Sequence, residues 1–212
     1  MTSMTSKGDA PLSRQAKVGA ASRLETRDRL QQAAAAEFTA HGYAGATVGR
    51  IAERAGVTVQ TLYLAWGSKR ELLRAYMTAA LAQGHGRHED VGAHFHGKTP
   101  REVVALLAVL VGKTAETAGT GWKLHRDAAA TDAEVAADWD QWQLMRRGTM
   151  DTIVAHIPDE ALRPGLSREA ARDTAWVIAS PESYELLVRR GGYSLEEFVH
   201  WMDATLAAAL LR

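Results

Sequence analysis

Apolar residues recur every three or four positions along most of the chain, which is the spacing of one face of an α-helix. Residues that favour the start of a helix stand in front of most of these segments. These residues are Ser22, Thr47, Thr58, Ser68, Thr99, Asp132, Ser167, Ser180 and Ser194. No run of alternating β-branched residues between turns indicates a sheet. The pattern therefore predicts an all-α protein.

Caps and glycines divide the chain into expected helices of unequal length. Two short helices are predicted after Thr47 and Thr58, and they end at Gly56 and Gly67. Longer helices are expected at residues 22–42, 68–83, 99–110, 120–130, 132–156, 167–179 and 194–211, with a short one from Ser180-Pro181. Residues 84–98, which are rich in glycine and histidine, are expected to form a loop or a frayed helix end.

The amino-acid composition indicates which broad class of protein this is. The 212 residues are 46% hydrophobic and 24% charged, which is typical of a soluble globular protein. The absence of cysteine excludes disulfides and thiolate chemistry. The first twenty residues lack the apolar run of a secretory signal, and no other apolar stretch is expected to approach the roughly 20 residues that cross a bilayer. We therefore expect a cytoplasmic protein.

The net charge of zero conceals an asymmetry between the two parts of the chain. Residues 1–75 contain 11 Lys/Arg and 6 Asp/Glu, whereas residues 76–212 contain the other 14 and 19. This division indicates a basic module that meets a polyanion, joined to an acidic body. An imbalance of a few charges is also common in halves of ordinary proteins, so other features must decide between the two interpretations.

The segment from Thr47 to Trp66 has the layout of a helix-turn-helix, with two short helices, a glycine turn and the small Ala52 where the helices meet. Val57 and Leu62 are expected to fill the angle between the helices. The second helix then exposes hydroxyl, amide and phenol groups that suit the major groove of DNA. These expected reading residues are Thr58, Val59, Gln60, Thr61 and Tyr63. Thr47 and Lys69, each at a helix start, are expected to contact phosphate, although structural helical hairpins share this layout.

A dense, ordered set of motifs surrounds this segment. The motifs are Ala-Ala-Ala-Glu-Phe ending at Phe38, Gly42-Tyr43, Thr47-Val48, Ile51-Ala52-Glu53-Arg54-Ala55-Gly56-Val57, Thr61-Leu62-Tyr63 and Trp66-Gly67-Ser68-Lys69-Arg70-Glu71-Leu72. With them, residues 27–76 resemble the N-terminal domain of the TetR family of regulators. The resemblance implies a homodimeric DNA-binding regulator, by default a repressor, with a three-helix DNA-binding unit on a larger helical domain that binds a small ligand. It also implies that Tyr63 and Lys69 contact the DNA backbone.

Two departures from the family pattern concern charge. Val59-Gln60 stand where many members carry Lys, Arg, Pro or Gly, and Leu64-Ala65 replace a basic and aromatic pair. The expected recognition helix therefore lacks basic side chains. The positive charge that grips DNA is expected to come from other residues, namely Lys7, Arg14, Lys17, Arg23, Arg27 and Arg50.

Three regions follow from these observations. Residues 1–21 are expected to form a disordered tail, residues 22–67 the DNA-binding domain, and residues 68–212 the ligand-binding and dimerisation domain, with 68–83 as the connecting helix. Aromatic and apolar residues at the middle of the body are candidates to line a ligand pocket, although such residues more often form plain core. They are Trp122, His125, Trp139, Trp142, Met145 and Trp176. The candidates for the dimer interface are Val177, Ile178, Trp201, Leu206 and Leu210.

Two other functions compete with this interpretation. His85, His88, His94 and His96 lie within twelve residues, but their spacing matches no recognised metal motif, so no metal site and no cofactor are expected. Asp138 and Asp140 could suit a cationic ligand but more simply form a solvated face. The chain also lacks a phosphate-binding glycine loop, a His-Glu-x-x-His motif and a nucleophile elbow. We therefore do not expect an enzyme.

Overall fold

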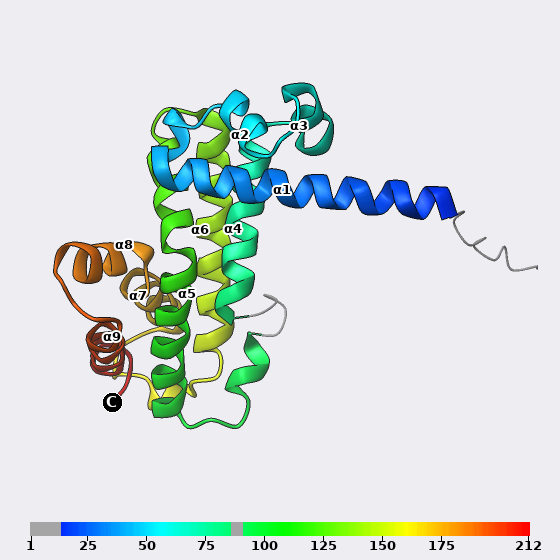
Figure 1. Cartoon of the computed structure of the whole chain (residues 1–212). Helices are drawn as coiled ribbons and strands as arrows, with labels where there is room; N and C mark the ends of the chain where they lie inside the picture. Colours follow the sequence, from blue (N-terminus) through cyan, green and yellow to red (C-terminus); the bar gives the residue numbers. More distant parts are fainter. Residues whose placement is uncertain (1–13, 86–90) are drawn as a thin grey trace, which may run out of the picture.

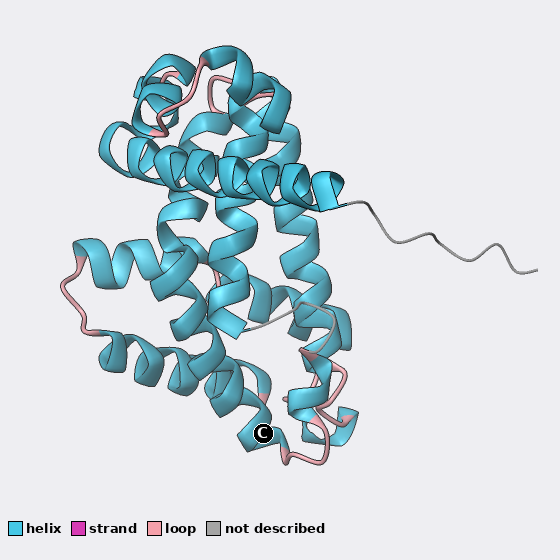
Figure 2. Ribbon diagram, turned by 45° about the vertical axis from the view of Figure 1, so that its right-hand side comes forward, coloured by secondary structure: helices cyan, strands magenta, loops and turns pink. Residues whose placement is uncertain are grey.

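The computed structural model describes residues 14–85 and 91–212, and in these ranges it consists of helices and connecting loops with no strand (Figures 1 and 2). The predicted all-α fold is confirmed. The α-helices are α1 (Arg14–Gly45), α2 (Val48–Arg54), α3 (Val59–Trp66), α4 (Lys69–His85), α5 (Pro100–Ala129), α6 (Ala133–Val154), α7 (Arg168–Ile178), α8 (Pro181–Tyr184) and α9 (Leu195–Leu210). Short 3₁₀ segments lie at Gly92–Phe95 (η2) and Asp159–Ala161 (η3), and a π-helical segment at Glu185–Arg190 (η4) follows α8.

Most helices begin where the capping residues predicted. The Thr47 and Thr58 hydroxyls accept hydrogen bonds from the backbone N–H groups at the third position of α2 and α3. Thr99 and Ser194 form complete capping boxes with Glu102 and Glu197, in which each partner satisfies a free N–H of the other. Local hydrogen bonding of this kind needs only neighbouring residues, which is why the sequence predicts it well.

Two predicted boundaries were wrong. The first helix begins at Arg14 rather than at Ser22, so residues 14–21 belong to α1, and only residues 1–13 of the expected tail remain, outside the described residues. Inside α1, Ser22 accepts a hydrogen bond from the Thr26 hydroxyl through its carbonyl oxygen instead of capping a helix. The expected separate helices near 99–110 and 120–130 are one helix of 30 residues, α5. Its glycines are tolerated because neighbouring helices cover it.

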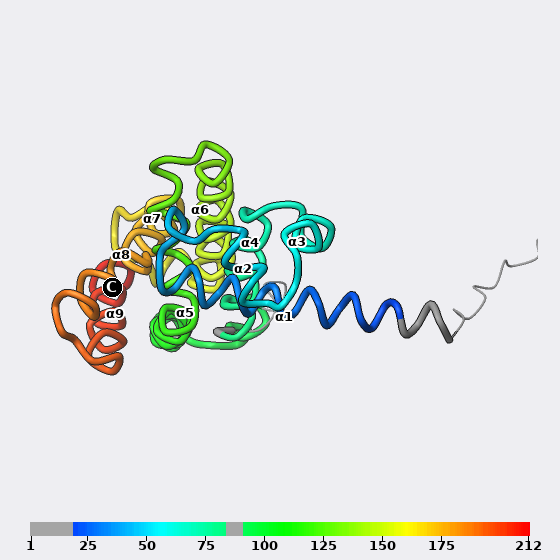
Figure 3. The backbone as a smooth tube through the Cα atoms, turned by 45° about the horizontal axis from the view of Figure 1, so that its top comes forward, coloured from blue at the N-terminus to red at the C-terminus, as the bar shows by residue number. Residues whose placement is uncertain are grey.

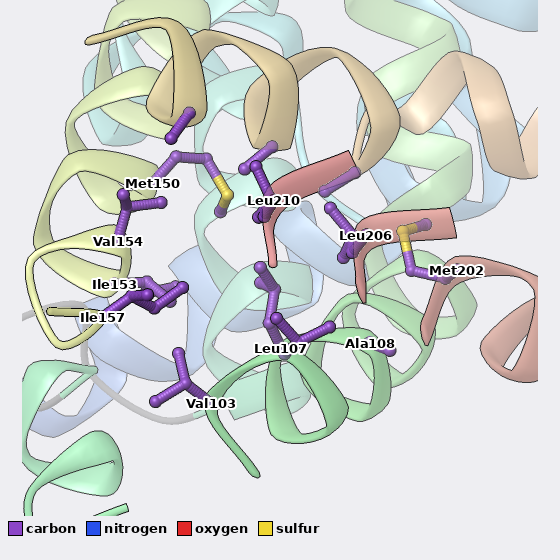
Figure 4. Close-up of a cluster of buried hydrophobic side chains, with 14 of the residues drawn as sticks. Val103, Leu107, Ala108, Met150, Ile153, Val154, Ile157, Met202, Leu206 and Leu210 are labelled. Atoms are coloured by element: carbon purple, nitrogen blue, oxygen red, sulfur yellow. The ribbon is translucent and has the colours of Figure 1, made fainter. Parts of the chain in front are cut away.

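Helix α5 is the centre of the body, and α4, α6 and α9 pack around it (Figure 1). By length and composition α5 would be apolar enough to cross a membrane, contrary to the sequence expectation. Its apolar side chains face other helices, because Val103, Leu107 and Ala108 join the buried cluster with residues of α6 and α9 (Figure 4). Its hydropathy is therefore that of a core helix.

The helix-turn-helix unit lies at one end of this bundle and is joined to it by a shared core. Leu30, Phe38 and Leu62 of the small unit pack in the same buried cluster as Leu124 of α5 and Val135 of α6. In both Figure 1 and Figure 3, α3 lies on the side of the molecule away from α7, α8 and α9. The arrangement leaves the outer face of α3 open while its inner face is fixed to the body.

Candidate nucleic-acid interface and ligand cavity

The turn between α2 and α3 depends on Gly56. Its φ of 66° lies in the left-handed region that glycine adopts without strain. The backbone N–H of Val57 donates to the Ala52 carbonyl oxygen at 3.0 Å, which closes the turn. Ala52 and Leu62 are 1% and 0% exposed, so the two helices meet closely with their apolar faces inward. The short-helix pair predicted from the spacing is present with this geometry.

The outer face of α3 carries several of the expected reading residues. Gln60 is exposed, and Tyr63 is 49% exposed. The Thr58 hydroxyl caps α3 through the Thr61 N–H at 3.1 Å and lies 2.9 Å from the Thr61 hydroxyl, so part of its hydrogen-bonding capacity is already used. Leu64, which the sequence argument did not select, is 82% exposed and extends this face. Its position three residues after Thr61 on the same helix was the signal that could have identified it.

Lys69 is turned toward the protein. Its Nζ donates to the backbone carbonyl oxygens of Tyr43 and Ala46 at 2.8 and 3.1 Å and lies 4.0 Å from the centre of the Tyr43 ring. Burial lowers the pKa of Lys69 below its ordinary value. The ammonium thus holds the connection from α1 to α2 in place, with one of its three protons left for a further acceptor.

Two arginines expected to grip DNA, Arg50 and Arg27, are exposed but already make contacts within the unit. Arg50 forms an ion pair with Glu37 at 3.1 Å, and Arg54 pairs with the same carboxylate at 3.0 Å. Glu37 is only 3% exposed, so it joins α1 to α2. The Arg27 guanidinium lies 3.8 Å from the centre of the Trp66 ring and donates to the Ala65 carbonyl. Of the basic residues named for this role, Arg23 is exposed; Lys7 and the side chains of Arg14 and Lys17 lie outside the described residues.

The start of α4 is connected to α6 by a buried ion pair. The Arg70 Nε and Nη2 atoms donate to the two Asp138 carboxylate oxygens, each at 2.6 Å. The pKa of Arg70 is raised, chiefly by these hydrogen bonds. Asp138 is 2% exposed, so the expectation that it belongs to a solvated face was wrong, whereas Asp140 is exposed. This pair joins the helix that follows the helix-turn-helix to the body.

A second contact reinforces the same junction. The Tyr43 hydroxyl donates to an Asp132 carboxylate oxygen at 3.3 Å, and Asp132 also caps α6. Burial and the neighbouring Asp132 carboxylate raise the pKa of Tyr43 to about 12. The N-terminal part of α6, with its cap Asp132, therefore contacts Tyr43 of the DNA-binding unit and Arg70 of the connecting helix α4.

A cavity of about 100 Å³ lies in the body between α4, α5, α6 and the segment around α8. Its walls are mainly aliphatic and aromatic, and they include Leu107, Trp122, Met145 and Tyr184. Arg146 is the one charged residue among the described residues that line it. The cavity has the apolar character of a small-molecule site with a few polar groups.

The structure divides the six ligand candidates. Trp122 and Met145 line the cavity. His125 is fully buried behind it, and its Nδ1 lies 3.0 Å from the Gly121 carbonyl oxygen. Trp139 and Trp142 pack edge-on against Trp122, with ring centres 5.9 and 6.5 Å away. Trp176 does not line the cavity but accepts a hydrogen bond from Arg146 through its carbonyl oxygen. These four residues do not line the cavity, whereas Arg146 lines it and was missed by the sequence argument.

Comparison with known proteins identifies the N-terminal unit. Residues 30–76 match the profile of the bacterial regulatory proteins of the tetR family. These residues are a DNA-binding domain of the TetR family. This family comprises DNA-binding transcriptional regulators with a helix-turn-helix, which are not enzymes. No curated protein sequence matches the chain at a significant level.

Solved structures show that the TetR fold extends over the body. NalD of Pseudomonas aeruginosa, the secondary repressor of the MexAB-OprM multidrug efflux pump, is 17% identical with a TM-score of 0.70, covering 91% of this chain and 98% of its own. SmeT in complex with triclosan is 19% identical with a TM-score of 0.70, covering 88% and 92%. FadR of Bacillus subtilis in complex with stearoyl-CoA is 19% identical with a TM-score of 0.59, covering 84% and 94%.

The expected dimer residues of this TetR protein fall into two groups. Leu206 and Leu210 are 0% exposed and pack inside the core, so naming them as interface residues was wrong (Figure 4). Their helix is amphipathic because it covers α5, and this burial was mistaken for an intermolecular one. Val177 is 61% exposed, and Ile178 and Trp201 are partly buried, so these three remain available for a partner.

The histidines of the 85–96 segment do not form a recognisable metal site among the described residues. His94 belongs to η2, and the His96 ring lies edge-on to His156, with ring centres 5.5 Å apart. His88 and the side chain of His85 lie outside the described residues.

Proposed function

We propose that this TetR protein is a ligand-responsive repressor that binds a palindromic operator as a homodimer in the cytoplasm. The observation that carries the proposal is the outer face of α3, where Gln60 and Tyr63 are exposed on a helix whose inner face is fixed. An amide and a phenol on such a helix suit base edges and phosphates of the major groove.

Each expected DNA-binding residue has a role under this proposal. Gln60 reads a base edge, and Tyr63 contacts the backbone beside it. Val59, 39% exposed, offers an apolar contact for a thymine methyl group. Thr47, Thr58 and Thr61 lie at the first turns of α2 and α3, where free N–H groups favour phosphate. Lys69 donates two hydrogen bonds to carbonyl oxygens of the unit, and its third N–H donates to a DNA phosphate.

The cavity is the proposed ligand site. Its walls come from α5 and α6, and α6 also holds the Asp138 carboxylate that binds Arg70 at the start of α4. A ligand that shifts α6 therefore alters the position of α4 and with it the helix-turn-helix. Complexes of the structurally similar SmeT with triclosan and FadR with stearoyl-CoA support an apolar effector. Control requires that the ligand prefer the state that does not bind DNA.

Selection of bound duplexes from a random-sequence pool tests the DNA-binding proposal. A palindrome with half-sites about one helical turn apart, or a multiple of it, is expected, because two copies of α3 related by a two-fold axis enter successive major grooves. Gel-shift titration of the selected duplex against a scrambled duplex at the same salt concentration measures the specificity. Equal binding to both duplexes would refute a sequence-specific operator.

The dimer proposal rests on the exposed Val177 of α7 and on the partly buried Ile178 and Trp201. Replacing Val177 by aspartate places a charge in this apolar surface, and we expect the dimer dissociation constant to rise by at least about tenfold. Sedimentation equilibrium measures the change. Leu24→Asp is the matched control, because Leu24 of α1 is similarly exposed, at 63% against 61%, but lies on another part of the molecule. A dimer equally stable in both variants would place the interface elsewhere.

A further inference from the structure

Arg146 is a cation in an otherwise apolar cavity. It extends from α6, is largely buried, and lines the cavity together with side chains that are aliphatic, aromatic or hydroxyl-bearing. Its guanidinium lies 5.6 Å from the centre of the Trp122 ring, which lines the same cavity. A charged group at this place requires an explanation, because removing an unpaired charge from water costs free energy.

All hydrogen-bond partners of Arg146 are neutral. Nη1 donates to the Gln143 side-chain oxygen at 2.6 Å, and Nη2 donates to the carbonyl oxygens of Trp176 and Ala179 at 3.1 and 3.0 Å. A guanidinium has five N–H donors, so these bonds use three of them. Within residues 14–85 and 91–212, no carboxylate forms an ion pair with Arg146.

No ion pair among the described residues neutralises the positive charge of Arg146. Burial lowers the pKa of Arg146 to about 10, and the nearby Glu182 opposes this shift only through space. At neutral pH the guanidinium therefore stays charged, with a field that attracts anions into the cavity and repels cations. In contrast, the next residue, Arg147, pairs with Asp173 at 2.8 Å on the surface.

Charged groups also line a hollow that borders this cavity. A neighbouring hollow shares Gly119, Trp122, Pro181 and Tyr184 with it. The hollow is also lined by Lys123, Arg126 and Arg189, against Glu182 and Glu185. Lys123 and Arg126 also pair with Asp127, so the charges around this hollow are balanced and do not repel an anion.

We propose that the cavity binds a small apolar acid, with its carboxylate on the free donors of Arg146 and its hydrocarbon body against the apolar walls. A hydrogen bond between two charged groups is stronger than one between neutral groups, particularly where water is excluded. The inference rests on the proposed ligand control of DNA binding and names the chemical class of the effector.

Three probes with the same hydrocarbon chain test the charge preference, namely octanoate, 1-octanol and octylammonium. Calorimetric titration of the full chain, with tryptophan fluorescence as a second signal from Trp122, gives each dissociation constant. We expect octanoate to bind at least about tenfold more tightly than 1-octanol, and octylammonium to bind most weakly. Equal affinities for octanoate and 1-octanol, or no binding of octanoate, would overturn the proposal.

Variants of Arg146 test whether this side chain causes the preference for octanoate. Arg146→Gln is expected to remove the preference for octanoate, whereas Arg146→Lys retains a cation and part of the preference. Arg147→Gln is the matched control, since it removes the adjacent arginine from a surface ion pair. Thermal unfolding reports whether each variant folds. If Arg146→Gln does not fold, Arg146→Lys and the three probes on the unaltered protein still decide the question. A folded Arg146→Gln protein that keeps the full preference contradicts the role of Arg146.

The same probes separate this inference from the proposed function. Gel shifts with the selected operator are repeated at saturating concentrations of each probe. If octanoate binds selectively but leaves operator affinity unchanged, the anion site is correct and ligand control is wrong. If 1-octanol releases the operator as well as octanoate does, ligand control is correct and the anion preference is wrong.

Discussion

Replacing Tyr63 by alanine is expected to lower affinity for operator DNA by at least about tenfold, equivalent to about 1.4 kcal/mol. Tyr63 is 49% exposed on the outer face of α3, so its removal deletes the proposed DNA contact without opening a cavity in the core. Circular dichroism and thermal unfolding should therefore remain close to those of the unaltered protein. Gel-shift titration with the selected operator at fixed salt measures the loss.

Two further variants sharpen the test of Tyr63. Tyr193→Ala is the matched control, because it removes a tyrosine that is 39% exposed in the body and is expected to leave DNA binding unchanged. Tyr63→Phe removes only the hydroxyl, and an intermediate affinity would show how much the hydroxyl contributes beyond the ring. Full affinity in a folded Tyr63→Ala protein would mean that another surface reads the DNA.

The second large effect concerns the pair between Arg70 and Asp138. Asp138→Ala is expected to lower the free energy of unfolding by about 3 kcal/mol, because it leaves Arg70 without its buried partner. The remaining contact of Arg70 is with Glu134 at 3.5 Å, and the Glu134 side chain is 76% exposed and weakly held. Urea unfolding followed by circular dichroism measures the change.

The surface ion pair between Asp173 and Arg147 provides the control for the Asp138→Ala variant. Asp173 binds Arg147 and Arg172, but its side chain is 40% exposed, so Asp173→Ala is expected to lower the free energy of unfolding far less than Asp138→Ala does. Because Asp138 also connects α6 with α4, its variant should additionally weaken the effect of a cavity ligand on operator binding. Equal unfolding midpoints for the two variants would show that the buried pair does not hold the two units together.

The sequence determined those features whose physical cause lies within a few residues. Caps such as Thr58 and Thr99 bond to N–H groups three positions ahead, and the turn at Gly56 depends on the conformation of a single residue. The order of motifs across residues 30–76 was equally readable, since the small unit is built from consecutive short helices. The fold class, the pair of short helices and the family of residues 30–76 follow from these local signals.

Only the tertiary structure decided which side chains are used by the protein itself and which remain for partners. Arg70 binds Asp138 at a separation of 68 residues, and Arg146 binds carbonyl oxygens 30 and 33 residues away. Leu206 and Val177 are both apolar residues of amphipathic helices, but one is buried and the other exposed. Periodicity gives the apolar face of a helix, whereas the packing of distant helices determines whether that face meets the core, a ligand or a second chain.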